Sequence, residues 1–159
     1  MYKKVFFSFH YENDVRRANV VRNSGVFRSI QEAGFIDKAE FEKIKRTGEN
    51  AVKRWIDQQL KGTSVTVVLL GEETLNRPYV RYEIEESYRK GNTIIGVKIG
   101  NIRDMVTGLK SINPSTVKII GTNVLGESLS FNEIVSGVYD YINDDGYNNL
   151  GKWIAKASV

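Results

Sequence analysis

No cysteine occurs among the 159 residues of this chain, and that absence excludes several kinds of chemistry. Disulfide bonds, thiolate metal sites and cysteine nucleophiles are all ruled out. A chain without cysteine is compatible with a reducing compartment, where disulfides are rare. Histidine is almost as scarce, because His10 is the only one. A serine–histidine–acid triad would therefore depend on His10, and a zinc site built from several histidines is excluded.

Long hydrophobic runs are also missing. The longest nearly apolar stretch runs only from Val65 to Leu70, whereas a membrane-spanning helix needs about 20 apolar residues. Near the N-terminus, the apolar run from Val5 to Phe9 is too short for the core of a signal peptide, and no small-residue cleavage site follows it. The sequence therefore predicts a soluble, cytoplasmic protein without a membrane partner.

Neither sign of charge dominates the chain. The 23 basic and 19 acidic residues give a formal net charge of +4. The basic residues are scattered along the chain, and a nucleic-acid-binding surface usually gathers them more strongly. We therefore expect a solvated basic face and no nucleic-acid partner. With 41% hydrophobic and 26% charged residues, the composition is globular, and the length predicts one domain over residues 1–159.

Strand-like and helix-like patterns alternate along the chain, which predicts an α/β protein with an open parallel sheet. The segment SVTVVLL at residues 64–70 is β-branched and apolar on both faces, as in a central parallel strand. The predicted strands cover residues 3–10, 34–37, 64–70, 93–99 and 117–120. The predicted helices cover residues 13–30, 49–60, 78–90, 131–142 and a short final segment around 150–157.

Local features at the helix ends support these assignments. Thr47 is expected to cap the helix at 49–60, and Pro78 suits the first turn of the helix at 78–90. Ser130 and Glu133 form the pattern of a capping box, in which the two side chains bond the free amides of the first turn. Apolar residues then recur at helical spacing from Phe131 to Ile142, which favours a helix there.

Open parallel sheets bind ligands beyond the carboxyl ends of their strands, where the strand order reverses. If the first strand lies between the second and third, the crevice lies beside Phe9, His10 and Tyr11, and beside Gly71 and Glu72. The GxGxxG and GxxxxGKS phosphate-binding motifs are both missing. The crevice is therefore expected to hold a ligand by other means.

Glu83 is the carboxylate that the pattern brings closest to this crevice. Helical spacing gives the helix at 78–90 one sheet-facing side, made of Val80, Ile84, Ser87 and Tyr88. Glu83 lies on the flank of that side, whereas Glu85 points to solvent. Partial burial would raise the pKa of Glu83, and its charge could stabilise a cationic centre. The pattern alone leaves an ordinary surface glutamate as the alternative.

Four blocks in the first two-thirds of the chain resemble the TIR-like ThsB proteins of bacterial Thoeris antiphage defence. They are KVFFSFHY at 4–11, NVVRN at 19–23, TSVTVVLLG at 63–71 and YVRYEI at 79–84, the last followed by KGN at 90–92. The resemblance covers most of residues 3–100. It implies a flavodoxin-like (TIR-type) open parallel five-stranded sheet with helices on both faces.

The same resemblance implies an activity and its partners. It implies an enzyme that cleaves the nicotinamide N-glycosidic bond of NAD and makes a cyclic ADP-ribose-type signal. NAD is the substrate, and no metal or other cofactor is expected. The implied partners are a ThsA-type effector reached through the signal, a phage-derived trigger, and further copies of the chain through self-association.

Site residues follow from the family pattern residue by residue. TIR domains carry their catalytic glutamate in a Trp-x-x-x-Glu pattern, which here is Tyr79-x-x-x-Glu83. The resemblance therefore makes Glu83 catalytic, with Tyr79 replacing the tryptophan of the pocket wall. The other expected substrate-binding residues are Phe9, His10, Arg22 and Asp37. Arg22 would pair with the pyrophosphate, and His10 would bond a phosphate or ribose.

Less specific roles stay open for these residues. Phe9 could belong to the core, His10 could be a capping or solvated histidine, and Arg22 could form a surface salt bridge. Trp55 and Trp153 are expected in the core. For the whole chain, the alternatives are a catalytically silent TIR adaptor that acts by protein–protein association, and a nucleotide-binding or nucleic-acid-binding α/β protein of unrelated role. Glu83 argues against the adaptor, because a scaffold has no need of it.

Overall fold

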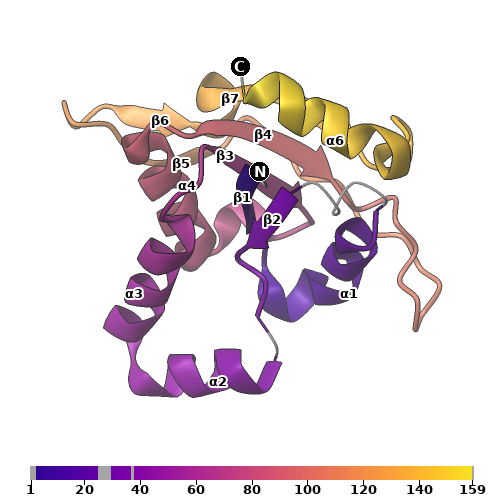
Figure 1. Ribbon diagram of the computed structural model, residues 1–159, viewed down its shortest axis with the longest axis horizontal. Helices are drawn as coiled ribbons and strands as arrows, with labels where there is room; N and C mark the ends of the chain where they lie inside the picture. The colour runs from indigo at the N-terminus through magenta and orange to yellow at the C-terminus, as the bar shows by residue number, and fades with distance from the viewer. Residues whose placement is uncertain (1–2, 25–29, 37, 159) are drawn as a thin grey trace.

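The computed structural model describes residues 3–24, 30–36 and 38–158, and within them a five-stranded sheet forms the centre (Figure 1). Its strand order is β2-β1-β3-β4-β7, and every neighbouring pair is parallel. The strands are β1 (Lys3–Ser8), β2 (Ile30–Ala33), β3 (Val65–Leu70), β4 (Thr93–Lys98) and β7 (Val135–Asp140). The flavodoxin-like fold expected from the sequence is therefore confirmed, and the strand order reverses between β1 and β3.

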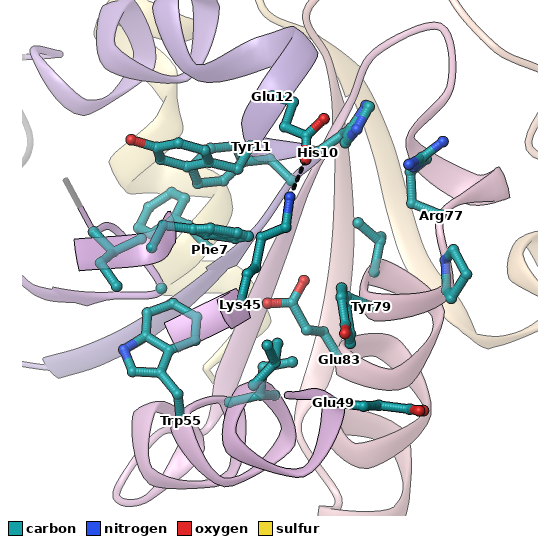
Figure 2. A pocket seen from close by; sticks show the side chains of 18 residues that line it. Phe7, His10, Tyr11, Glu12, Lys45, Glu49, Trp55, Arg77, Tyr79 and Glu83 are labelled. Carbon is teal, nitrogen blue, oxygen red and sulfur yellow. Dashed lines mark hydrogen bonds and ion pairs between the residues drawn. The ribbon is translucent and has the colours of Figure 1, made fainter. Parts of the chain in front are cut away.

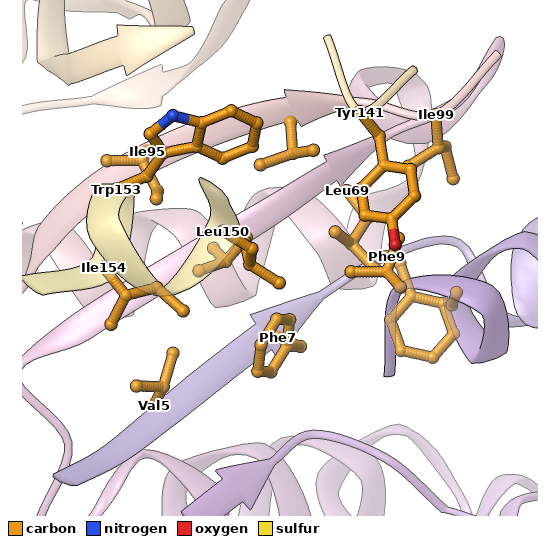
Figure 3. Packing of buried hydrophobic residues seen from close by; sticks show 14 of the residues in the cluster. Val5, Phe7, Phe9, Leu69, Ile95, Ile99, Tyr141, Leu150, Trp153 and Ile154 are labelled. Carbon is orange, nitrogen blue, oxygen red and sulfur yellow. The ribbon is translucent and has the colours of Figure 1, made fainter. Parts of the chain in front are cut away.

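Helices cover both faces of this sheet. On one face, α1 (Tyr11–Arg22) and α6 (Gly146–Ala157) enclose the largest core, which includes Phe7, Leu69 and Leu150 (Figure 3). On the other face, α3 (Glu49–Leu60) and α4 (Pro78–Lys90) cover two smaller cores. Figure 1 shows α2 (Lys38–Thr47) crossing the end of α3 that lies away from the sheet. Trp153 is buried in the first core, as predicted.

The side chains of β1 alternate between these two faces. Val5 and Phe7 belong to the core beneath α1 and α6, whereas Phe6 belongs to the core beneath α3. Ser8 also lies on the second side, where it contacts Glu83 of α4. Because successive residues of a strand point to opposite faces, the order of residues in β1 sends the hydroxyl of Ser8 toward α4.

The second strand lies earlier in the chain than the sequence predicts. It is β2, at Ile30–Ala33, not residues 34–37, and the helix predicted at 13–30 ends at Arg22. Only Ala33 of β2 is buried, because β2 is an edge strand. A short edge strand with exposed polar residues carries little of the pattern by which strands are recognised.

The residues before α3 were also interpreted wrongly. Thr47 does not cap α3, because it is the last residue of α2, and its hydroxyl donates to the carbonyl of Lys43 at 3.1 Å. Gly48 occupies the N-cap position of α3 without a side-chain cap. The predicted elements did not include α2. Its lysines and glutamates are common in loops as well as in helices, so its pattern was overlooked.

The predicted helix at 131–142 is wrong for most of its length. A single turn, α5 (Phe131–Ile134), is followed at once by the edge strand β7. The capping box does not form, because Ser130 bonds the side chain of Asn132. The predicted strand at 117–120 is shifted by two residues and does not join the main sheet: β5 (Ile119–Thr122) pairs antiparallel with β6 (Ser128–Ser130). Pairing with β4 decides the conformation of residues 135–140, and local propensity does not reveal it.

The loop between β3 and α4 holds a short 3₁₀ turn, η1 (Thr74–Asn76). The final helix, α6, follows Asp145, whose φ of 52° is left-handed. Among the described residues, no helix is long and apolar enough to cross a membrane.

Gly34 provides a test of how β1 and the chain after β2 pack together. Its φ is +94°, and an added Cβ would lie 2.2 Å from the carbonyl oxygen of Phe7. Gly126 has a similar φ of +79°, but open space surrounds it. A left-handed φ alone costs alanine about 1–2 kcal/mol. We expect Gly126→Ala to lose about that much stability and Gly34→Ala at least about 1 kcal/mol more, because of the clash. Urea unfolding of both variants measures the difference, and equal losses would contradict the described packing.

Candidate active site

A cavity of about 440 Å³ opens beside the carboxyl end of β1 (Figure 2). Its walls come from the residues after β1 and from α2, α3 and α4. The predicted crevice beside Phe9, His10 and Tyr11 is therefore present. Gly71 and Glu72, which were expected beside it, are not among the lining residues. Gly71 lies instead against Asp14 of α1, whose carboxylate leaves no room for a Cβ there.

Glu83 reaches this cavity from the middle of α4. Pro78 begins the helix and Gly91, with a left-handed φ of 91°, ends it, so Glu83 is held by more than a turn of helix on either side. Its side chain is only 7% exposed. The hydroxyl of Ser8 donates a hydrogen bond of 2.8 Å to its Oε1. None of the ion pairs within the described residues involves Glu83.

Burial without a cationic partner controls the ionisation of Glu83. Desolvation disfavours the charged form and raises the pKa of the carboxyl to about 8, while the hydrogen bond from Ser8 lowers it in part. At neutral pH, burial therefore favours the protonated form of Glu83. A carboxyl with a raised pKa in a concave site is a candidate for chemistry, since stability alone would favour an apolar residue there.

The sides of α4 differ from the prediction at two residues. Val80, Ile84 and Ser87 are buried as expected, but Tyr88 is 45% exposed. Glu85 does not point freely to solvent, since its carboxylate lies against Gly121 of β5. The hairpin of β5 and β6 packs over this part of α4, and a helical pattern does not show that a distant segment covers it.

His10 follows β1 in an extended conformation, and its side chain is 8% exposed. Neither ring nitrogen has a hydrogen-bond partner among the described residues. Burial lowers the pKa of His10, and the positive charge of Arg77 lowers it further. The predicted contact of His10 with a ligand is untested, but the structure places the ring in the cavity wall beside Arg77 (Figure 2).

Aromatic side chains form much of the remaining wall. Tyr79 stands one turn before Glu83 on α4, and Figure 2 shows the two side by side. Phe9 lines the cavity and is also part of the main core, so its two expected roles coexist. Trp55 packs against the core of α3 and lines the cavity as well, so the expectation of a core residue describes it only in part.

Sequence reasoning missed two cations of the cavity, Lys45 and Arg77. Lys45 comes from α2 and pairs with Glu12 at 2.5 Å. Arg77 is exposed and has no ion pair with another described residue. Its position just before Pro78 could have revealed it, whereas Lys45 lies on a helix that was not predicted. Among the residues described, no cluster of three or more acids or histidines could hold a metal ion.

One predicted substrate-binding residue, Arg22, does not line this cavity. Arg22 pairs with Glu32 at 2.6 Å, and its guanidinium lies 4.9 Å from the centre of the Phe35 ring. It lines an adjoining hollow of about 540 Å³, which shares Phe9, Tyr11 and Ile36 with the cavity. The surface salt bridge that the sequence analysis gave as the alternative role of Arg22 is therefore present. Asp37 lies outside the described residues.

Comparison with known proteins adds independent information. A family model described as "Thoeris protein ThsB, TIR-like domain" matches residues 6–104, a range that holds Ser8, Tyr79 and Glu83. A protein of Bacillus cereus (strain MSX-D12) is named "Putative cyclic ADP-D-ribose synthase ThsB1". It is 36% identical over 191 aligned positions, which cover 97% of this chain and 100% of that protein.

The burial of Glu83 predicts a pH-dependent stability difference for Glu83→Gln. The folded-state pKa of about 8 exceeds the unfolded value of 4.5, so the folded chain binds more protons between these values and wild-type stability falls as the pH rises. Glutamine resembles the neutral acid and does not ionise, so the stability of the variant does not fall in this way as the pH rises. We expect the variant to lie within about 1 kcal/mol of wild-type stability near pH 5 and to exceed it by about 3–4 kcal/mol at pH 8.

Denaturant unfolding at both pH values measures this difference. Glu86→Gln is the matched control, because Glu86 lies on the same helix, outside the cavity, in an exposed ion pair with Arg89. It should show no comparable gain at pH 8. An advantage of Glu83→Gln that is the same at both pH values would contradict the raised pKa.

Proposed function

Because this chain belongs to the family of Thoeris ThsB proteins with a TIR-like domain, we propose that it is an NAD-processing enzyme of antiphage defence. It cleaves the N-glycosidic bond between nicotinamide and ribose and converts the remainder to a cyclic ADP-ribose-type signal. The Bacillus cereus relative is named for the synthesis of a product of this class. The observation that carries the proposal is the buried carboxyl of Glu83 in the wall of a cavity.

Glu83 supports this chemistry through its charge. As nicotinamide leaves, the ribose carbon becomes an oxocarbenium-like centre, which a nearby carboxylate stabilises. NAD itself brings a positive charge on its nicotinamide ring. A cation about 4 Å away is worth about 4 kcal/mol to a carboxylate at an effective dielectric constant of about 20. Ionising a group with a pKa of about 8 at pH 7 costs only about 1.4 kcal/mol. Bound substrate would therefore convert Glu83 to its charged form.

The rest of the cavity suits the other parts of NAD. Its volume is within the range of about 300–1,000 Å³ that small-molecule sites occupy. Phe9, Tyr79 and Trp55 offer aromatic surface for a flat ring. Lys45 and Arg77 offer positive charge for the pyrophosphate, a role that the sequence analysis gave to Arg22. Arg22 lines only the adjoining hollow and is paired with Glu32, which does not support that role.

The wider biological role extends the same proposal. The cyclic signal would activate a ThsA-type effector, and a phage-derived trigger would start the synthesis. Residues 1–159 would act as one domain in the cytoplasm, with self-association as a way to complete the active form. Family membership and the relative's name support this context.

A catalytically silent adaptor fits the cavity less well. Keeping a carboxyl buried without a cation costs folding free energy at neutral pH. An adaptor gains nothing from this cost, whereas an enzyme that stabilises a cationic centre does. Glu83 therefore favours the enzyme.

Replacing Glu83 by glutamine tests the proposed function. Purified protein at high concentration, and extracts of cells challenged with phage, are assayed for nicotinamide and for ADP-ribose products by chromatography with mass detection. We expect Glu83→Gln to lower NAD turnover at least about 100-fold, as removal of a group that stabilises transition-state charge does.

Glu86→Gln makes the same chemical change one turn of helix away, outside the cavity, and should keep wild-type turnover. Equal turnover in Glu83→Gln and wild type would show that the site is elsewhere. If neither purified wild type nor extracts of infected cells yield nicotinamide, the adaptor replaces the enzyme.

A further inference from the structure

His10 and Glu83 face the same cavity because side chains alternate between the two faces along extended chain. Ser8 and His10 are two residues apart in extended chain, so they point to the same side of the sheet, about 7 Å apart along the strand direction. Ser8 bonds Glu83 directly. His10 therefore lies one step beyond Glu83 toward the carboxyl end of β1, and both side chains line the cavity.

The two ring nitrogens of His10 have no partner in the part of the chain that the structure describes, and this points to a ligand. Its side chain is more than nine-tenths buried, and neither nitrogen has a hydrogen bond within the described structure. An unsatisfied buried polar group costs about 1–3 kcal/mol. When such a group lies in a cavity wall, a bound molecule can supply the missing hydrogen bond.

The surroundings of His10 lower its pKa and so favour the neutral imidazole. Burial is the largest influence, and the positive charge of Arg77 is the second. Glu12 and Glu73 oppose them, and Lys45 adds the smallest effect, in the lowering direction. A neutral imidazole has one nitrogen that accepts a proton and one that donates, so it can serve as a base at neutral pH.

The proposed reaction has a proton to dispose of. Nicotinamide leaves with the electron pair of the broken C–N bond and is neutral. A hydroxyl oxygen of the same ADP-ribose then forms the new C–O bond to the oxocarbenium carbon, and the O–H bond breaks. Each turnover thus releases one proton, which a base must accept. Attack by water would release a proton too and would give linear ADP-ribose. A base that holds the sugar hydroxyl therefore favours the cyclic product over the linear one.

We propose that His10 is the general base for ring closure: one of its nitrogens orients the attacking hydroxyl of ADP-ribose and accepts its proton. Glu83 does not suit the role of this base, because it faces the cationic carbon and would lose its stabilising charge if it accepted the proton. Glu12 is engaged with Lys45, and Glu49 is exposed and paired with Lys53. The inference rests on the proposed function and adds the residue that determines the product.

The test compares His10→Gln and His10→Ala with wild type, by the share of cyclic product among all products. Glutamine keeps hydrogen bonding but is no base. We expect the cyclic share to fall at least about tenfold in both variants, with linear ADP-ribose in its place, because nicotinamide leaves before the base is needed. The wild-type cyclic share should also fall as acid protonates His10. Arg77→Gln is the control for a binding residue: it should raise KM, and at alkaline pH, where His10 is neutral in both proteins, it should leave the cyclic share unchanged.

Other outcomes would overturn the inference. If KM rises in the His10 variants and the cyclic share does not change, His10 only binds substrate. If folded variants, shown by unchanged melting temperatures, lose nicotinamide release, His10 acts before ring closure. If wild type releases no nicotinamide, the proposed function fails, and ring closure by His10 fails with it.

A second measurement needs no turnover. Because the chain has one histidine, the imidazole ¹H–¹³C resonance of protein without a histidine tag reports on His10 alone. Addition of ADP-ribose should shift that resonance and its titration midpoint in wild type and in Glu83→Gln alike. A resonance that ADP-ribose leaves unchanged would overturn the contact on which the inference depends.

Discussion

The hydrogen bond from Ser8 to Glu83 ties the last residue of the inner strand β1 to the middle of α4, and the site is organised around it. Among the described residues it is the side-chain hydrogen bond that the buried carboxyl makes, so it fixes where any charge on Glu83 would lie. His10 follows two residues after Ser8 in extended chain, on the same side of the sheet. One strand of alternating residues therefore supplies both the core beneath α1 and α6 and the polar contacts of the cavity.

Two groups of the cavity, Glu83 and His10, lower the stability of the fold, and a bound substrate would remove this cost. Burial makes the carboxylate form of Glu83 unfavourable, and the unsatisfied nitrogens of His10 add a further cost. A substrate with a cationic ring and several hydroxyls would relieve both costs, because it brings a charge for Glu83 and hydrogen bonds for His10. Such local costs are typical of functional sites, where the surrounding core maintains a geometry that stability alone would not select. Here that core is provided by β1, β3 and the helices on both faces of the sheet.

The sequence predicted those parts of the fold that rest on strong local patterns. The buried strands β1, β3 and β4 and the helix α4, with Pro78 at its start and Gly91 at its end, follow from apolar runs and caps. The edge strands β2 and β7 could not be predicted in this way, because pairing with a central strand stabilises them and their own residues are mixed. In the site, Glu83, Tyr79, Phe9 and His10 lie on or next to well-predicted elements and do line one cavity. Lys45 was missed because only tertiary packing brings α2 to that cavity.

In the proposed reaction, the ionised form of the buried Glu83 drives the loss of nicotinamide. The most direct measurement is the pH dependence of kcat/KM for nicotinamide release, which reports the pKa of the essential group in the free enzyme. The account predicts that kcat/KM rises with pH through a midpoint well above 4.5, toward about 8. Ser8→Ala should move that midpoint to still higher pH, because it removes the hydrogen bond that favours the carboxylate. A rate that does not vary between about pH 5 and 9, or a midpoint that Ser8→Ala leaves in place, would contradict it.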